Sequence, residues 1–270
     1  MTAKQKNFVK GAAILGIAGL ICKVIGAVFR IPLSNAIGTQ GMANYQAAYP
    51  LYAFLLVISS AGLPTAISKM VSERVTKGDY RGAHFTFQVA YKVLLIVGVI
   101  TSVLLFAASP LVSKLIGLDS SMYSFMAIAP ALFFVSILSA YRGYFQGLQM
   151  MTPTALTQIV EQVGKLAVGL SLASLMGQRG PQYGAAGALI GVTVSEVLAL
   201  IVVIIMYNKN KSTILRNISR APKMGLKRDF KSTAKKLFVI AIPITIGACI
   251  MPLVSAIDSA VVMNSLQSSG

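Results

Sequence analysis

Seven ionisable residues stand inside long apolar runs of this sequence, where charged side chains are rare. They are the bases Lys23, Arg30, Lys92 and Lys165 and the acids Glu161, Glu196 and Asp258. A charge at the centre of a bilayer costs about 2.5–3.5 kcal/mol on insertion scales, so such residues are candidates for binding or transport. Bases outnumber acids among them, and a basic cavity inside a membrane suits an anion such as the phosphate groups of a lipid.

Lys23 and Arg30 are seven residues apart in the first apolar run. In an α-helix, seven residues return to within about 20° of the same direction and advance about 10 Å. One helix face is therefore predicted to present two stacked cations. The alternative for Arg30 is a side chain that extends to the outer headgroups, and Lys92 is expected to extend in the same way to the inner ones.

Glu161 and Lys165 have the i, i+4 spacing of an intrahelical ion pair, with the glutamate on the N-terminal side. We expect them to pair, either as a fixed structural pair or as one that exchanges partners during a conformational cycle. Glu196 has no partner within its own run, so it either meets a base of another helix or is protonated. Arg142 is expected to anchor the inner end of its run, and Asp258 is isolated.

The elements that carry these residues are predicted to be membrane-spanning helices. The 270-residue chain is 56% apolar and only 11% charged, less than half the charged fraction of about 25% in soluble domains. This composition excludes a soluble enzyme, a secreted disulfide scaffold and a disordered tail. A spanning helix needs about 20 apolar residues, and such runs cover residues 8–31, 45–68, 85–108, 122–146, 153–176, 183–207 and 237–262.

Helices are predicted because a backbone inside a bilayer must satisfy its own hydrogen bonds, and no alternating barrel pattern is present. The fold class is therefore all-α and polytopic, with seven spans. Pro32 is expected to end the first span, because the residue before a proline disfavours helix. We read this first run as a retained span, not a cleaved signal.

The net charge of +17 is distributed unevenly between the two sides of the predicted membrane. Of the 24 Lys and Arg residues, 18 fall on the side of the N-terminus and only three on the other, and cytoplasmic loops collect such residues. The N-terminus is therefore predicted to be cytoplasmic. Ten bases lie between Lys209 and Lys236, and this segment is expected to lie on anionic lipid headgroups.

The basic segment also divides the chain. We expect residues 1–207 to form a six-helix lobe, 208–236 a basic cytoplasmic linker, and 237–270 the first helix of a truncated second lobe. The chain is thus expected to be the N-terminal half of a longer protein. Cys22 and Cys249 lie in apolar runs without the spacing of metal ligands, and His84 is expected to be solvated in a polar loop. No metal or cofactor is expected.

Three motifs resemble the stage V sporulation protein B and lipid II flippase branch of the multidrug/oligosaccharidyl-lipid/polysaccharide flippase superfamily. The first is similar to its R-x-x-G-x-x-x-R helix, with lysine in place of the leading arginine. The motifs are Lys23-Val-Ile-Gly26-Ala-Val-Phe-Arg30; Ala61-Gly-Leu-Pro-Thr-Ala-Ile-Ser-Lys69 with Met-Val-Ser-Glu73; and Arg142-Gly-Tyr-Phe-Gln-Gly147 with Gln149-Met-Met-Thr-Pro153 and Glu161-Gln162.

The resemblance implies two six-helix lobes around a central cavity, alternating access, and an undecaprenyl-diphosphate-linked saccharide as substrate. It also implies that Lys23, and less directly Arg30, contact the diphosphate. Lys165, Glu161 and Glu196 join them as candidate substrate-binding residues. The alternative is a cation-coupled drug exporter of the same superfamily, with Glu161 or Glu196 as its ion site. A membrane glycosyltransferase or phosphatase is disfavoured because the loop acids are scattered, and a non-transporting scaffold stays open.

Overall fold

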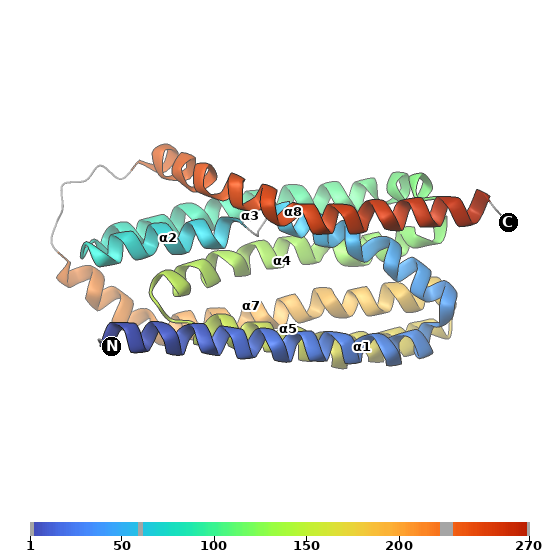
Figure 1. Cartoon of the computed structure of the whole chain (residues 1–270), viewed down its shortest axis with the longest axis horizontal. Coiled ribbons are helices and arrows are strands. Elements are labelled where there is room, and N and C mark those ends of the chain that lie inside the picture. Colours follow the sequence, from blue (N-terminus) through green and yellow to red (C-terminus); the bar gives the residue numbers. More distant parts are fainter. Residues whose placement is uncertain (1–2, 59–61, 222–228, 269–270) are drawn as a thin grey trace.

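The chain forms a bundle of long helices in its computed structural model, which describes residues 3–58, 62–221 and 229–268 (Figure 1). No strand occurs in these ranges, and six of their helices are long and apolar enough to cross a membrane. The predicted class, an all-α polytopic membrane protein, is therefore confirmed.

The first two elements replace the first two predicted spans, and the later elements follow the predicted runs closely. In chain order they are α1 (Ala3–Leu56), α2 (Gly62–Thr76), α3 (Tyr80–Leu115), the short 3₁₀ turn η2 (Asp119–Ser121), α4 (Met122–Gly147), α5 (Thr152–Gly164), the π-helical turn η3 (Lys165–Gly169), α6 (Leu170–Gly177), α7 (Pro181–Arg220) and α8 (Phe230–Ser268).

Helix α1 contains the first predicted span and much of the second, because it turns back on itself at Gly38 (Figure 1). Gly38 has φ 67° and ψ −176°, a conformation open essentially to glycine alone. Pro32 does not end the helix as predicted. It lies inside α1, as prolines can in membrane helices whose neighbours satisfy the freed carbonyl. This merging accounts for six long helices where seven spans were predicted.

Helix α4 is the centre of the bundle. Of its most apolar stretch 61% is buried, against 11% for α1 and α8. Its side chains join two cores: Phe125 and Leu132 pack with α1 and α7, whereas Ala140 and Tyr144 pack with α2, α3 and α8. The outer helices expose apolar side chains such as Val103, as expected where the solvent is lipid.

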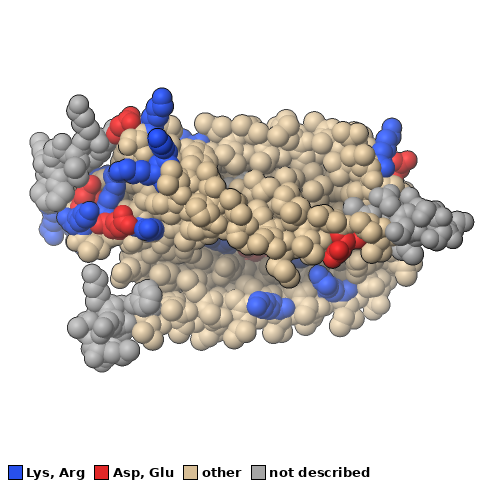
Figure 2. Space-filling view, turned by 45° about the horizontal axis from the view of Figure 1, so that its top comes forward, with Lys and Arg blue, Asp and Glu red and all other residues tan. Residues whose placement is uncertain are grey.

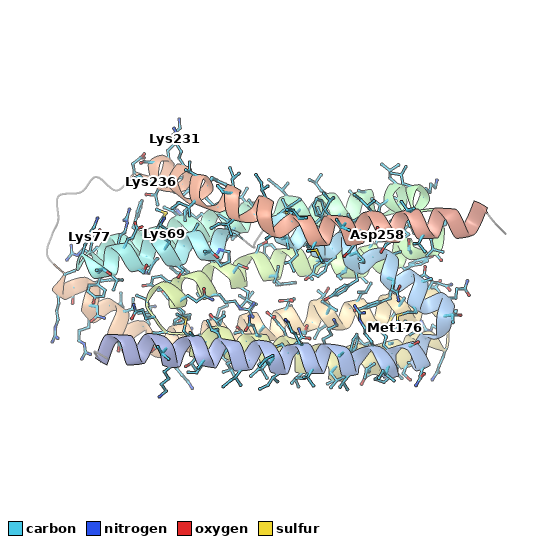
Figure 3. The ribbon with its side chains drawn as sticks, viewed as in Figure 1. Lys69, Lys77, Met176, Lys231, Lys236 and Asp258 are labelled. Atoms are coloured by element: carbon cyan, nitrogen blue, oxygen red, sulfur yellow. The ribbon has the colours of Figure 1, made fainter. Side chains whose placement is uncertain are left out.

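Basic side chains gather at one end of the bundle, which we call the basic end. Figure 3 places Lys69, Lys77, Lys231 and Lys236 there, and most of the blue side chains in Figure 2 lie at the same end. Helix α7 remains helical to Arg220 and α8 begins at Phe230, so much of the predicted 208–236 linker is helix.

Helices α5 to α7 approach closely through glycine. A Cβ added at Gly191 of α7 would overlap the backbone of Gly169, the last residue of η3. Only a hydrogen side chain permits this approach, which small residues commonly provide between membrane helices. The contact holds the π-helical turn, and with it Lys165, against α7.

Candidate functional site

Three bases predicted from the sequence line one pocket of about 350 Å³, which we call the basic pocket. Its lining comes from both halves of α1, from α5 and from η3. The lining residues are Lys23, Gly26, Ala27, Phe29, Arg30, Tyr45, Tyr49, Gln162 and Lys165. Its volume lies within the range of about 300–1,000 Å³ that is usual for small-molecule sites. No acidic side chain is among the lining residues that the structure describes.

The pocket exists because α1 folds back at Gly38. The first half of α1 contributes Lys23 and Arg30, and both side chains are exposed, as expected at an open mouth. The second half contributes Tyr45 and Tyr49, whose rings are stacked with their centroids 5.4 Å apart. Two cations on one helix face therefore look across the pocket toward an aromatic wall.

Lys165 forms the buried part of the pocket, with only 9% of its surface exposed. Its Nζ lies 3.5 Å from Tyr49 Oη, 4.6 Å from the centroid of the Tyr49 ring and 4.9 Å from that of Phe29. These cation–π contacts partly replace the water that burial removes. Lys165 forms no ion pair with a carboxylate among residues 9–259, so its charge is open to an anionic ligand.

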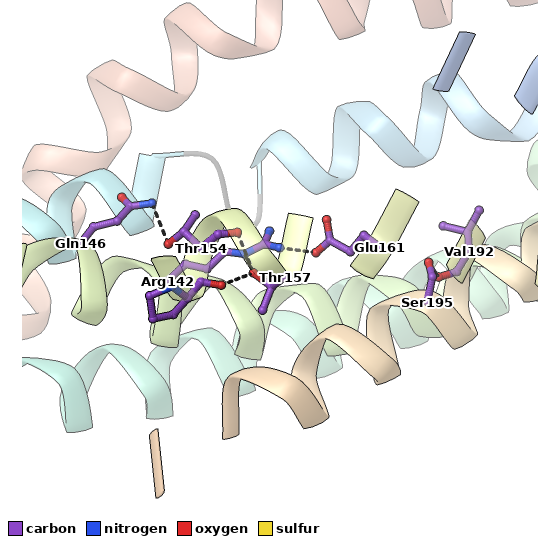
Figure 4. A network of polar contacts seen from close by, with 8 residues as sticks. Arg142, Gln146, Thr154, Thr157, Glu161, Val192 and Ser195 are labelled. Carbon is purple, nitrogen blue, oxygen red and sulfur yellow. Dashed lines mark hydrogen bonds and ion pairs between the residues drawn. The ribbon is translucent and has the colours of Figure 1, made fainter. Parts of the chain in front are cut away.

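Glu161 pairs with Arg142, and the predicted ion pair with Lys165 is wrong. The Arg142 Nη2 lies 2.5 Å from Glu161 Oε1, and both side chains are 13% exposed (Figure 4). Arg142 Nε also donates to Thr157 Oγ1 at 2.9 Å. The i, i+4 spacing permitted the Lys165 pair, but a guanidinium from α4 with two partners on α5 binds the carboxylate instead. Arg142 is therefore not the simple interfacial anchor predicted.

Glu196 lies on α7 beside this pair and is buried. It interacts electrostatically with Glu161 and Arg142, and less strongly with Lys165. Its Oε2 is buried without a hydrogen-bond partner among the described residues. Glu161 and Glu196 are thus brought together with Arg142, but neither lines the basic pocket. Asp258 is exposed on α8, away from both groups.

Comparison with known proteins places the chain. The family described as "Polysaccharide biosynthesis protein" matches residues 8–270. The chain belongs to this family. Stage V sporulation protein B of Bacillus subtilis (strain 168) is 30% identical, covering 99% of this chain and 51% of that protein. Lipid II flippase MurJ of the same organism is also 30% identical, covering 94% of this chain and 49% of the flippase.

This polysaccharide biosynthesis protein also resembles solved transporters in fold. A crystal structure of MATE in the straight conformation superposes with a TM-score of 0.75 at 15% identity, covering 89% of this chain and 52% of that one. The likeness supports a polytopic fold of the MOP superfamily. The chain spans about half the length of the relatives that it matches.

Sequence reasoning missed the aromatic wall of the basic pocket in this family member. Tyr45, Tyr49 and Tyr52 are spaced i, i+4, i+7 and share one helix face, a signal that could have been used. Gln162 was noted only as part of a motif, yet it lines the pocket beside Lys165. No group of three or more His, Cys, Asp or Glu able to hold a metal occurs in the described ranges.

Proposed function

We propose that the chain is the substrate-carrying half of a flippase that moves an undecaprenyl-diphosphate-linked saccharide across the bacterial plasma membrane by alternating access. One observation carries this proposal: Lys23, Arg30 and Lys165 line a single pocket without an acidic neighbour in its lining. A diphosphate diester carries two negative charges, so three cations suffice to bind it. The name of one relative, a lipid II flippase, agrees with this substrate class.

Each lining group has a part in this proposal. Lys23 and Arg30 at the mouth and Lys165 at the buried wall would hold the diphosphate, Arg30 in the bidentate manner that only arginine allows. The Tyr45 and Tyr49 hydroxyls and the Gln162 amide can form hydrogen bonds with the first sugar. Glu161 and Glu196 would act indirectly, by holding Arg142 and the α4–α5–α7 packing next to the pocket.

Transport by the full-length protein tests the substrate class directly. We expect proteoliposomes containing the complete transporter to move a fluorescent undecaprenyl diphosphate-linked saccharide, and not to export an organic cation such as ethidium. Efflux of ethidium driven by a sodium or proton gradient, without movement of the lipid, would favour the cation-coupled exporter. The buried carboxylates Glu161 and Glu196 are the observation that keeps that second candidate in view.

We further propose that the basic end faces the cytoplasm. On this arrangement residues 1–207 form the first lobe, the bases of residues 208–236 contact anionic headgroups, and residues 237–270 open the second lobe. The clustering of bases at one end of the bundle supports this orientation (Figure 3). The missing lobe would complete the cavity.

Thiol labelling tests the orientation. After Cys22 and Cys249 are replaced by alanine, single cysteines at Thr39 and Gln178 are expected to react with an impermeant maleimide in intact cells. Cysteines at Thr76 and Ser219 are expected to react only after the cells are permeabilised. All four native residues are exposed in the structure, so burial does not explain a difference. The reverse labelling pattern would overturn the proposed orientation.

A further inference from the structure

A second pocket, of about 390 Å³, lies between α3, α4 and α7. We call it the tyrosine pocket. It shares no residue with the basic pocket and has no acidic lining residue among those described. It is lined by His84, Phe87, Gln88, Tyr91, Lys92, Tyr141 and Tyr207. The ring of Phe87 packs against those of Tyr91, Tyr141 and Tyr207 with centroids 6.3, 5.2 and 5.6 Å apart, so the wall is a continuous aromatic cluster.

The tyrosine pocket lies where the helices enter the hydrocarbon layer. In α3 an apolar run begins directly after Lys92 and continues to Val112, 20 residues, enough to cross the hydrocarbon core. In α7 the apolar run ends at Tyr207, and the polar residues Asn208 and Lys209 follow. Tyrosine and a polar or basic residue thus stand at the same boundary on two helices, the depth at which lipid headgroups lie.

His84 gives the pocket an unused polar group. It was predicted to be solvated in a polar loop, but it lies within α3, half-buried against the rings of Phe87 and Tyr144 at 5.9 and 6.0 Å. Its Nε2 lies 3.4 Å from the Gln88 side-chain nitrogen, whereas its Nδ1 is buried with no hydrogen-bond partner among the described residues. A buried polar atom without a partner destabilises the protein unless a ligand or water reaches it.

The tyrosine pocket opens toward lipid. Lys92 is exposed, and the α3 residues that follow it at helical spacing, Ile96, Val99 and Val103, are exposed apolar side chains. Their spacing of four, seven and eleven residues keeps them on the face of Lys92. A molecule with its polar part on Lys92 would therefore have a lipid-facing apolar stripe directly beneath it.

We propose that the tyrosine pocket binds the headgroup of an anionic phospholipid from the leaflet at the basic end. The phosphate lies on the Lys92 ammonium, and the headgroup hydroxyls interact with the Gln88, His84 and tyrosine side chains. The acyl chains follow the stripe formed by Ile96, Val99 and Val103. An aromatic belt alone would not provide a cavity, a cation and an unpartnered imidazole nitrogen together. This site is independent of the transported substrate.

Lipid retention tests the site. The chain, purified in mild detergent, is incubated with equal amounts of phosphatidylglycerol and phosphatidylcholine, and the bound lipids are counted by native mass spectrometry. We expect phosphatidylglycerol to be preferred, and Lys92→Gln to reduce that preference about fivefold, the effect of one base near a membrane surface. Lys92→Arg is expected to keep it. Lys114→Gln is the matched control, because Lys114 is an exposed base at the other end of α3 and outside the pocket.

A fluorescence measurement tests the same site without removing Lys92. The chain has no tryptophan, so Tyr91→Trp places a single reporter in the pocket and Phe106→Trp one on the exposed face of α3. In vesicles of mixed composition, brominated phosphatidylglycerol is expected to quench Trp at 91 severalfold more than brominated phosphatidylcholine. Trp at 106 should be quenched equally by both. Equal quenching at position 91, or unchanged lipid retention in Lys92→Gln, would overturn the proposal.

Discussion

Lys23→Gln and Lys165→Gln are each expected to abolish the growth that the full-length transporter supports in cells depending on it. Both bases line the basic pocket, one at its mouth and one at its buried wall. A unit charge pair 4 Å apart at an effective dielectric of about 20 gains about 4 kcal/mol before desolvation is subtracted. A net loss of about 1–3 kcal/mol weakens binding of the diphosphate about 5- to 150-fold. Arg30→Gln is expected to give an intermediate loss.

The controls separate charge from folding. Lys23→Arg is expected to preserve growth, because it keeps a cation at the mouth of the pocket, and Lys114→Gln is expected to behave as the parent. All variants should accumulate normally in the membrane, since removing an intramembrane charge eases insertion. Transport of the lipid-linked saccharide at the parental rate by Lys23→Gln would show that Lys23 only extends to the headgroups and does not bind substrate.

Arg142→Gln is expected to lower the free energy of unfolding by about 3–5 kcal/mol, the usual cost of leaving one charge of a buried pair uncompensated. Arg142 is the guanidinium partner of Glu161, and Glu196 lies beside them. Without Arg142 two neighbouring carboxyl groups would face each other. Glu161→Gln should cost less, because Arg142 keeps its hydrogen bond to Thr157 and its attraction to Glu196. Denaturant unfolding of the protein in detergent micelles measures both changes.

A double-mutant cycle identifies the true partner of Glu161. Arg142→Met with Glu161→Gln should recover much of the loss, with a coupling energy of about 0.5–3 kcal/mol. The matched control is the pair suggested by the sequence: Glu161 and Lys165 should couple by less than about 0.5 kcal/mol, because Lys165 turns to Tyr49 and Phe29. Strong coupling in the control cycle, with none to Arg142, would contradict the arrangement described here.

Much of the fold follows from local sequence. Runs of about 20 apolar residues can only be helices in a bilayer, because no water is present to satisfy an open backbone. The predicted runs 85–108, 122–146 and 183–207 accordingly lie within α3, α4 and α7. The helical spacing that puts Lys23 and Arg30 on one face is equally local, and both residues line the same pocket.

The partners of the buried charges depended on the tertiary structure. Spacing along one helix permits Glu161 to meet Lys165, but the spacing says nothing about Arg142, which is 19 residues away on α4 and reaches Glu161 across the bundle. The turn at Gly38 is also tertiary in its consequence. It brings Tyr45 and Tyr49 opposite Lys23 and converts a basic helix face into a pocket.

The sequence by itself therefore determined the solvent, the helices and the excess of bases within them, because each depends on residue type and on spacing along one helix. Only the tertiary structure decided which charges neutralise each other and which remain open. Helix packing sets those distances, and electrostatic attraction in a low-dielectric interior depends steeply on them. Arg142 and Glu161 became a closed pair, whereas Lys165 was left facing the basic pocket with Lys23 and Arg30.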